Sequence, residues 1–168
     1  ITYDLFRDQA VLLQALFAGE YDVREENIAK AWTGEYTHPA VTSGKIKKEE
    51  INHSIPTGMQ AFIFNTRRAF FADVAVREAL QYAFDYEWSN KQFASGAYKR
   101  TASYFENSEL AAHGEPQGRT LEILQGLAKE HPGAVPLRAL TEVYQNPVTD
   151  GSGRGIRANL GKAKQVLE

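Results

Sequence analysis

Residues 64–85 have the sequence FNTRRAFFADVAVREALQYAFD, which decides the fold more than any other stretch of the chain. Asp73 is a good N-cap residue for a helix that follows it. The apolar residues after it recur on one helical face, namely Val76, Leu80, Ala83 and Phe84. Arg77 follows Asp73 at the i, i+4 spacing that favours an ion pair near a helix start. The stretch therefore predicts a well-defined helix beginning at Asp73.

The segment just before this helix has the composition of a β strand. Residues 59–65 (MQAFIFN) are rich in aromatic and apolar side chains and follow Pro56 and Gly58. Both faces of such a strand are apolar. A strand of this kind is either covered on both sides or has one face lining a pocket.

Caps and apolar periodicity predict further helices along the chain. They fall after Asp8 up to Gly19, and at residues 25–32, 87–94, 119–129 and 157–168. The charged run 45–51 is either an edge strand or a solvated loop. Aromatic residues crowd positions 82–105, where core packing and a lining for an extended peptide or sugar are the two interpretations.

Composition excludes several classes of protein. The 168 residues suit one domain, and their net charge of −2 gives no basic surface for nucleic acid or an anionic membrane. The absence of cysteine excludes disulfides, thiolate metal sites and cysteine nucleophiles. No apolar window is long enough for a membrane span, and no signal peptide is present. We therefore expect neither nucleic-acid binding nor direct membrane insertion.

Catalytic and metal-binding motifs fail their spacing tests. The loop 150–155 (DGSGRG) lacks both the P-loop spacing and the alternating carboxylates of a calcium loop. The four histidines are far apart, and no G-x-S-x-G elbow occurs. We expect no catalytic residues, no metal ligands and no cofactor, and the protein is not expected to be an enzyme.

Three segments in order resemble the family 5 extracellular solute-binding proteins, the dipeptide- and oligopeptide-binding receptors of bacterial ABC importers. They are residues 16–22 (LFAGEYD), 64–85, and 150–163. The second is the most specific, with its Asn, Phe, Asp, Val-Arg-x-Ala-Leu and Ala-x-Asp pattern. Residues 86–91, 104–111 and 119–124 look like the microcin C and oligopeptide-binding branch.

The resemblance implies a fold as well as a function. Such receptors have the bilobal type II periplasmic-binding-protein fold, α/β in each lobe, and they close around a peptide. Because the chain opens on Ile1 and its last helix lacks a capping glycine, we expect residues 1–168 to be a single fragment. It would be the first part of the second lobe, with a mixed sheet flanked by helices.

The implied function is non-enzymatic. The parent protein would be secreted, capture an oligopeptide or modified peptide in the periplasm, and deliver it to the permease subunits of an ABC transporter. The isolated fragment would lack the signal peptide, and its exposed lobe surface could form a dimer in a crystal. A sensor or interaction domain that reuses the lobe, or a hydrolase, are the alternatives.

The resemblance also implies that two regions of the chain lie close to the ligand cleft. In the first, candidate contacts are Arg24, Glu25, Asn27 and Trp32, with Arg24 suited to a carboxylate and Trp32 to an apolar side chain. The alternative is that Arg24 merely pairs with Glu25 or Glu26. In the second, alternation along the predicted strand directs Ala61 and Ile63 to one side, and Asn65 ends it.

Overall fold

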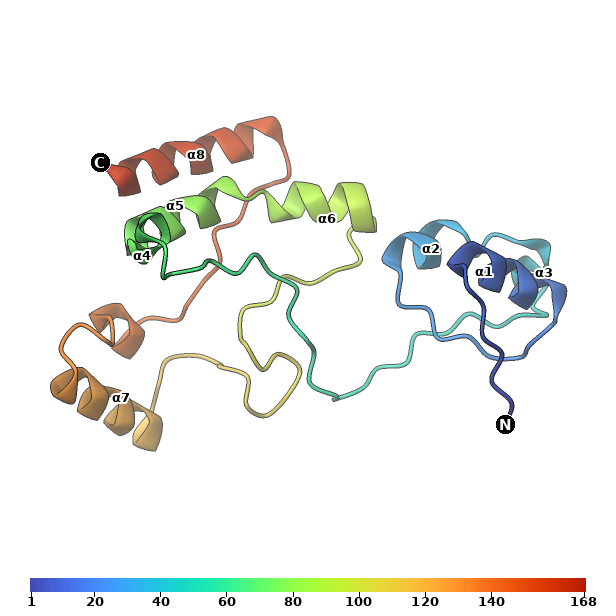
Figure 1. Cartoon of the computed structure of the whole chain (residues 1–168), viewed down its shortest axis with the longest axis horizontal. Coiled ribbons are helices and arrows are strands. Elements are labelled where there is room, and N and C mark those ends of the chain that lie inside the picture. The colour runs from blue at the N-terminus through green and yellow to red at the C-terminus, as the bar shows by residue number, and fades with distance from the viewer. The chain divides into compact units, whose positions relative to one another are not determined.

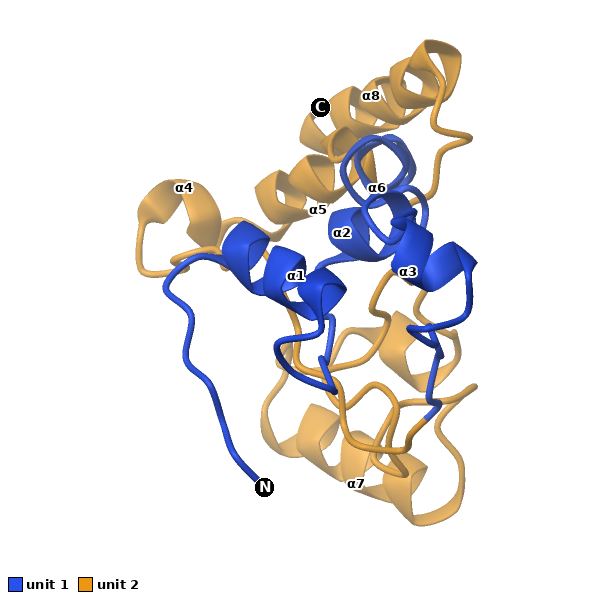
Figure 2. Ribbon diagram, turned by 90° about the vertical axis from the view of Figure 1, so that its right-hand side faces the viewer, with its two compact units in different colours: residues 1–52, 87–98 blue, residues 53–86, 99–168 orange.

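The computed structural model describes all 168 residues and consists of helices and connecting segments (Figure 1). The chain forms two compact units, which are coloured separately in Figure 2. Unit 1 comprises residues 1–52 and 87–98, and unit 2 comprises residues 53–86 and 99–168.

Unit 1 contains α1 (Gln9–Ala18), α2 (Ala29–Gly34), α3 (Pro39–Thr42) and most of α6 (Tyr86–Ala94). The start of α1 is capped by Asp8, whose Oδ1 accepts from the N–H groups of Ala10 and Val11 at 2.8 and 3.0 Å. Its end is set by Gly19, which adopts the left-handed φ of 78°. The predictions for this helix and for the helix at residues 87–94 are confirmed.

The predicted helix at residues 25–32 is wrong in its start, because α2 begins at Ala29. Residues 23–28 remain non-helical. Here Glu26 accepts from the N–H of Ile28 at 3.0 Å, a local bond that competes with a helical turn. The same carboxylate also binds Arg24, so its hydrogen-bonding capacity is used outside a helix.

Unit 2 contains α4 (Ala69–Ala72), α5 (Val74–Ala83), α7 (Gly118–Glu130), the 3₁₀ helix η1 (Leu137–Leu140) and α8 (Gly153–Leu167). The largest contact between any two elements joins α5 and α8 (Figure 1). Ala79 of α5 and Ala163 of α8 are both buried, and such small side chains let two helices approach closely. Asn159 is the one buried polar residue, and its Nδ2 donates to the carbonyl of Val148 at 3.0 Å.

Asp73 caps α5 as predicted, since its Oδ1 accepts from the N–H of Ala75 at 2.8 Å. The expected ion pair between Asp73 and Arg77 is wrong. Arg77 instead donates through Nη1 to the carbonyls of Phe71 and Ala72 at 2.6 and 2.8 Å. These carbonyls end the short helix α4 and have no partner within it, so the guanidinium satisfies them.

The predicted mixed sheet is wrong, because the structure contains no β strand. Residues 59–65 lie outside regular structure, and all of them are exposed except the half-buried Phe64. Asn65 accepts from the N–H of Arg68 at 3.0 Å in a turn. A strand needs a neighbour that supplies ladder hydrogen bonds, and no other segment of this chain pairs with residues 59–65. The strand-like composition of residues 59–65 is therefore not sufficient to form a sheet, and the predicted α/β fold class is wrong.

The segment before residue 59 is held by the loop that follows residue 100. Asn107, with a positive φ of 62°, donates through Nδ2 to the carbonyls of His53 and Ile55, each at 2.9 Å. The carbonyl of Glu106 accepts from the N–H of Thr57 at 3.0 Å. These bonds hold together two parts of unit 2 that are distant in the sequence.

The apolar core is small in both units. The buried apolar residues are mostly alanine, and no large side chain is fully buried. Many large apolar side chains are exposed instead, among them Phe62, Ile63, Phe70 and Leu167. No helix is both long enough and apolar enough to cross a membrane.

The glycines of α8 provide a paired test of its N-terminal turn. A Cβ at Gly155 would lie 2.3 Å from Oδ1 and 3.1 Å from the backbone nitrogen of Asp150, whereas one at Gly161 would meet nothing within 4 Å. We expect Gly155→Ala to lower the free energy of unfolding by about 1–3 kcal/mol through overpacking. Gly161→Ala should raise it by about 0.5–1 kcal/mol. Urea unfolding followed by circular dichroism measures both, and equal effects of the two substitutions would contradict this account.

Candidate functional site

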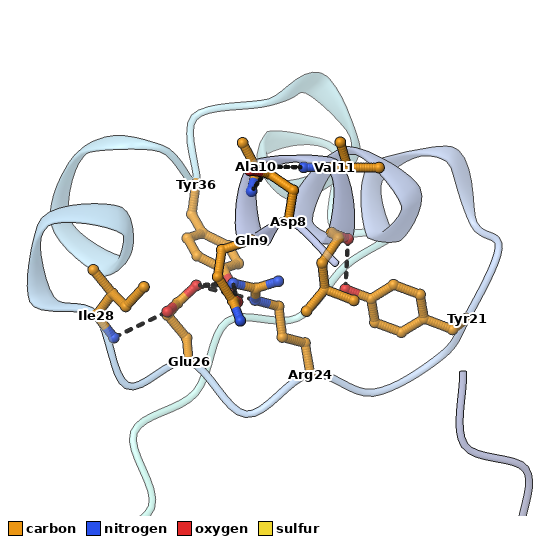
Figure 3. A network of polar contacts seen from close by, with 10 residues as sticks. Asp8, Gln9, Ala10, Val11, Tyr21, Arg24, Glu26, Ile28 and Tyr36 are labelled. Carbon is orange, nitrogen blue, oxygen red and sulfur yellow. Dashed lines mark hydrogen bonds and ion pairs between the residues drawn. The ribbon is translucent and has the colours of Figure 1, made fainter. Parts of the chain in front are cut away.

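The centre of the candidate site is a buried ion pair in unit 1 (Figure 3). Arg24 contacts Oε2 of Glu26 through Nη2 at 2.9 Å and through Nε at 3.0 Å. The two side chains are only 5% and 2% exposed. Charged side chains with so little exposed surface are tolerated only when they are paired and hydrogen-bonded, so the geometry fixes both side chains.

Further hydrogen bonds extend the pair into a network (Figure 3). Glu26 accepts from the N–H of Ile28 at 3.0 Å and from the hydroxyl of Tyr36 at 3.1 Å. Arg24 also donates to Oε1 of Gln9 at 3.3 Å. The network thus joins α1, the segment before α2, and the turn after α2. Among the polar atoms of this network, Nη1 of Arg24 is buried without a hydrogen-bond partner.

The electrostatics of the network keep it charged at neutral pH. Burial acts to raise the pKa of Glu26, but the hydrogen bonds from Ile28, Tyr36 and Arg24 and the charge of Arg24 hold it below its ordinary value of 4.5. Burial acts to lower the pKa of Arg24, and its bonds to Tyr21 and Glu26 with the charge of Glu26 leave it raised. Burial and the bond to Glu26 raise the pKa of Tyr36 to about 12, so its hydroxyl remains a donor.

Tyr36 connects this network to a row of aromatic rings, which we call the aromatic row: Trp32, Tyr36, Phe17 and His38. The ring centroids of Trp32 and Tyr36 are 5.6 Å apart, and those of Tyr36 and Phe17 are 6.0 Å apart. Phe17 and His38 stack at 4.5 Å with nearly parallel planes. All four side chains are half-buried, so the row presents an apolar surface that still meets solvent.

Two charged residues of opposite sign hold Trp32 at one end of the aromatic row. The ammonium of Lys48 lies 4.1 Å from the Trp32 ring centroid and donates to the Trp32 carbonyl. The indole Nε1 donates to Oε1 of Glu50 at 3.1 Å. An ammonium and a carboxylate beside an apolar ring can meet the charged and apolar groups of one ligand together. No three His, Cys, Asp or Glu side chains gather as metal ligands would.

The structure connects some of the predicted ligand residues in unit 1 and separates others from the network. Arg24 and Trp32 are linked through Glu26 and Tyr36. Arg24 pairs with Glu26. The sequence left this pairing open as the alternative to ligand binding by Arg24. Glu25 and Asn27 are exposed and take no part in the network.

The second group of predicted residues lies in unit 2. Ala61 and Ile63 are exposed on the non-helical segment 59–65. Asn65 is also exposed, and its Oδ1 accepts from the N–H of Arg67 at 3.2 Å, which forms the turn before α4. Ligand contact by any of the three stays a prediction.

Sequence reasoning missed the residues that surround Trp32. Lys48 and Glu50 belong to the charged run 45–51, which was interpreted as an edge strand or a solvated loop. Their spacing of two residues, which brings two side chains of an extended segment to the same face, was the available signal. No local sequence pattern marks Phe17, Tyr36 and His38, because their contacts depend on the tertiary fold.

Comparison with known proteins identifies the family. Residues 1–168 match the family described as bacterial extracellular solute-binding proteins, family 5 Middle. The chain belongs to this family. The match covers its whole length, so the family resemblance predicted from three segments is confirmed.

Several curated relatives carry names that refer to binding. The chain is 42% identical to the "Probable peptide-binding protein YejA" of Agrobacterium fabrum over 170 residues, which cover 100% of this chain and 27% of that protein. It is also 39% identical to the "Uncharacterized protein YejA" of Escherichia coli, whose name refers to no binding, over 99% of this chain and 27% of the relative. It is also 39% identical to the "Peptidoglycan-binding protein YepA" of Agrobacterium fabrum, over 91% of this chain and 25% of the relative. The chain thus spans about a quarter of the length of these relatives.

The buried pair predicts a specific dependence of stability on pH. Folding lowers the pKa of Glu26, so the ionised carboxylate stabilises the folded state fully above about pH 4.5. This stabilisation is lost as the pH falls through the pKa that Glu26 has in the folded state. We expect Glu26→Gln to lower the free energy of unfolding by about 3 kcal/mol at neutral pH, since Arg24 then stays buried without a counter-charge. The difference from the unsubstituted chain should shrink below pH 4.5. Chemical unfolding at several pH values measures it.

The matched control for this substitution is Glu25→Gln, on the exposed neighbour outside the network. It should change stability by less than about 0.5 kcal/mol, as surface substitutions usually do. Equal losses for the two variants, or a loss for Glu26→Gln that does not depend on pH, would show that the buried pair does not stabilise unit 1.

Proposed function

We propose that the chain is part of the substrate-binding component of an ABC-type importer that takes up peptides or modified peptides. In this role the parent protein is non-enzymatic, works in the periplasm, and delivers its ligand to the permease subunits of the transporter. The observation that carries the proposal is the match of residues 1–168 to the family of extracellular solute-binding proteins. Relatives named for binding peptide or peptidoglycan support a peptide-containing ligand.

The proposal extends to the place of this chain in the larger protein. The family description refers to a middle portion, and the relatives are about four times as long, which supports a segment of a longer receptor. We place it in the second of two lobes, as its resemblance to the receptors implies. The microcin C and oligopeptide-binding branch is proposed on residues 86–91, 104–111 and 119–124.

Trp32 is the proposed contact for an apolar part of the ligand. Its ring is held between Tyr36 and Lys48, so little side-chain freedom is left to lose when a ligand packs on it. The neighbouring Lys48 and Glu50 are both exposed, and they can pair with a carboxylate and an amino group of a peptide. This combination suits a ligand that carries both charges along with apolar side chains.

Arg24 has a supporting role in this proposal. Its guanidinium is buried against Glu26, and Glu26 holds the hydroxyl of Tyr36 in the middle of the aromatic row. Glu25 and Asn27 are exposed beside the pair and remain proposed ligand contacts, as do Ala61, Ile63 and Asn65 in unit 2. A dimer formed through exposed apolar surface remains a further proposal.

Peptide binding by the longer protein tests the function. Calorimetric titration with a pool of short peptides should give saturable binding, whereas the 168-residue chain should bind weakly because it supplies part of the cleft. Trp32→Ala in the longer protein should weaken binding about tenfold or more, as expected for an aromatic side chain at the centre of an interface.

The matched control replaces the other tryptophan of unit 1. Trp88 lies on α6, packs on Phe93, and is outside the aromatic row, so Trp88→Ala should leave peptide affinity within about twofold. Thermal unfolding of both variants shows whether they fold. The function is wrong if the longer protein binds no peptide of the pool, and the role of Trp32 is wrong if a folded Trp32→Ala variant binds as tightly as the unsubstituted protein.

A further inference from the structure

An apolar groove in unit 2 is lined by none of the residues proposed to contact ligand. It is formed by α4, α5 and α8 and has a volume of about 200 Å³. The side chains that line it are all apolar: Phe70, Val76, Ala79, Leu80, Ala83, Ala163 and Leu167. Figure 1 shows α5 and α8 side by side, with α4 at the start of α5. The groove is therefore a feature of the packed helices and not of a loop.

The chemistry of the groove argues against a polar solute as its occupant. Binding sites for small molecules combine apolar walls with a few polar groups that orient the ligand, and no polar side chain lines this groove. Phe70 and Leu167 are 65% and 58% exposed, although side chains of this size are usually covered in a folded protein. The groove has the properties of a contact surface for another apolar side chain.

The size of the groove limits what can fill it. An apolar cavity of about 150 Å³ holds a benzene molecule. The volume of about 200 Å³ therefore has room for one large side chain such as leucine or phenylalanine. A stable interface between separate molecules covers about 800 Å² on each partner, which is far more than one such side chain.

We propose that the groove is filled by a large apolar side chain from the same polypeptide, outside residues 1–168. This inference rests on the proposed function in one respect, namely that the parent protein is as long as the relatives. In the relatives, about three quarters of the residues lie outside the part that matches this chain. A segment tethered to the groove has a high effective concentration and loses less freedom than a free partner. A single-residue contact is therefore sufficient within one polypeptide but weak between two.

Thiol accessibility tests the proposal, because the chain contains no cysteine. Ala83→Cys places one thiol in the groove, and Lys164→Cys places one on an exposed position of α8 as the control. Both are introduced into the 168-residue chain and into the longer protein encoded by its gene. We expect Cys at 83 to react with a maleimide about as fast as Cys at 164 in the short chain. In the longer protein only the reaction at position 83 should slow, by tenfold or more.

The outcomes of this experiment distinguish the possible occupants of the groove. Equal reaction rates at position 83 in the two proteins, or a gene that encodes no further residues, would overturn the proposal. If Cys at position 83 of the short chain reacts more slowly as the protein concentration rises, the proposal is also overturned. That result would indicate that a second copy of the chain fills the groove. Circular dichroism checks that both variants keep their helices. Because the readout is thiol reactivity in the absence of peptide, its result is independent of whether the protein binds peptide.

Discussion

The buried ion pair between Arg24 and Glu26 is the interaction on which unit 1 and the proposed ligand surface depend. Two charges lose their hydration when they are buried, so each needs the other and its hydrogen bonds. Gln9, Ile28 and Tyr36 supply those bonds from three separate segments. One pair of side chains thus fixes α1, the start of α2 and the turn after it. The position of the aromatic row follows from the bond between Glu26 and Tyr36.

Unit 2 depends on a different constraint, which is the shortage of buried apolar surface. Helices α5 and α8 meet through small residues, Ala79 and Ala163, and larger side chains along them remain exposed. Apolar surface of this kind contributes to stability only when it is covered. The groove between α4, α5 and α8 is one place where such cover is needed. The curated relatives are about four times as long as this chain, and we propose that further residues of the same polypeptide supply this cover.

Sequence reasoning succeeded where structure depends on neighbouring residues and failed where it depends on distant ones. The caps Asp8 and Asp73 act on N–H groups two or three residues away, and both were predicted. The segment 59–65 has strand composition, but a sheet requires a partner that composition cannot reveal. At the site, pairing of Arg24 with Glu25 or Glu26 was one of two interpretations, and the structure shows the pair with Glu26, while ligand contact by Trp32 stays a prediction. Lys48, Glu50 and Tyr36 were not foreseen as its partners, because the fold brings them to Trp32.

A structure of the longer protein with a bound peptide tests the central claim most directly. The claim is that Arg24 and Glu26 support the ligand surface while Trp32 contacts the ligand. It predicts peptide atoms within about 4 Å of the Trp32 ring, the usual distance of apolar contact, with the Arg24–Glu26 pair intact. A peptide whose carboxylate has replaced Glu26 as the partner of Arg24, or a peptide bound away from Trp32, would contradict it.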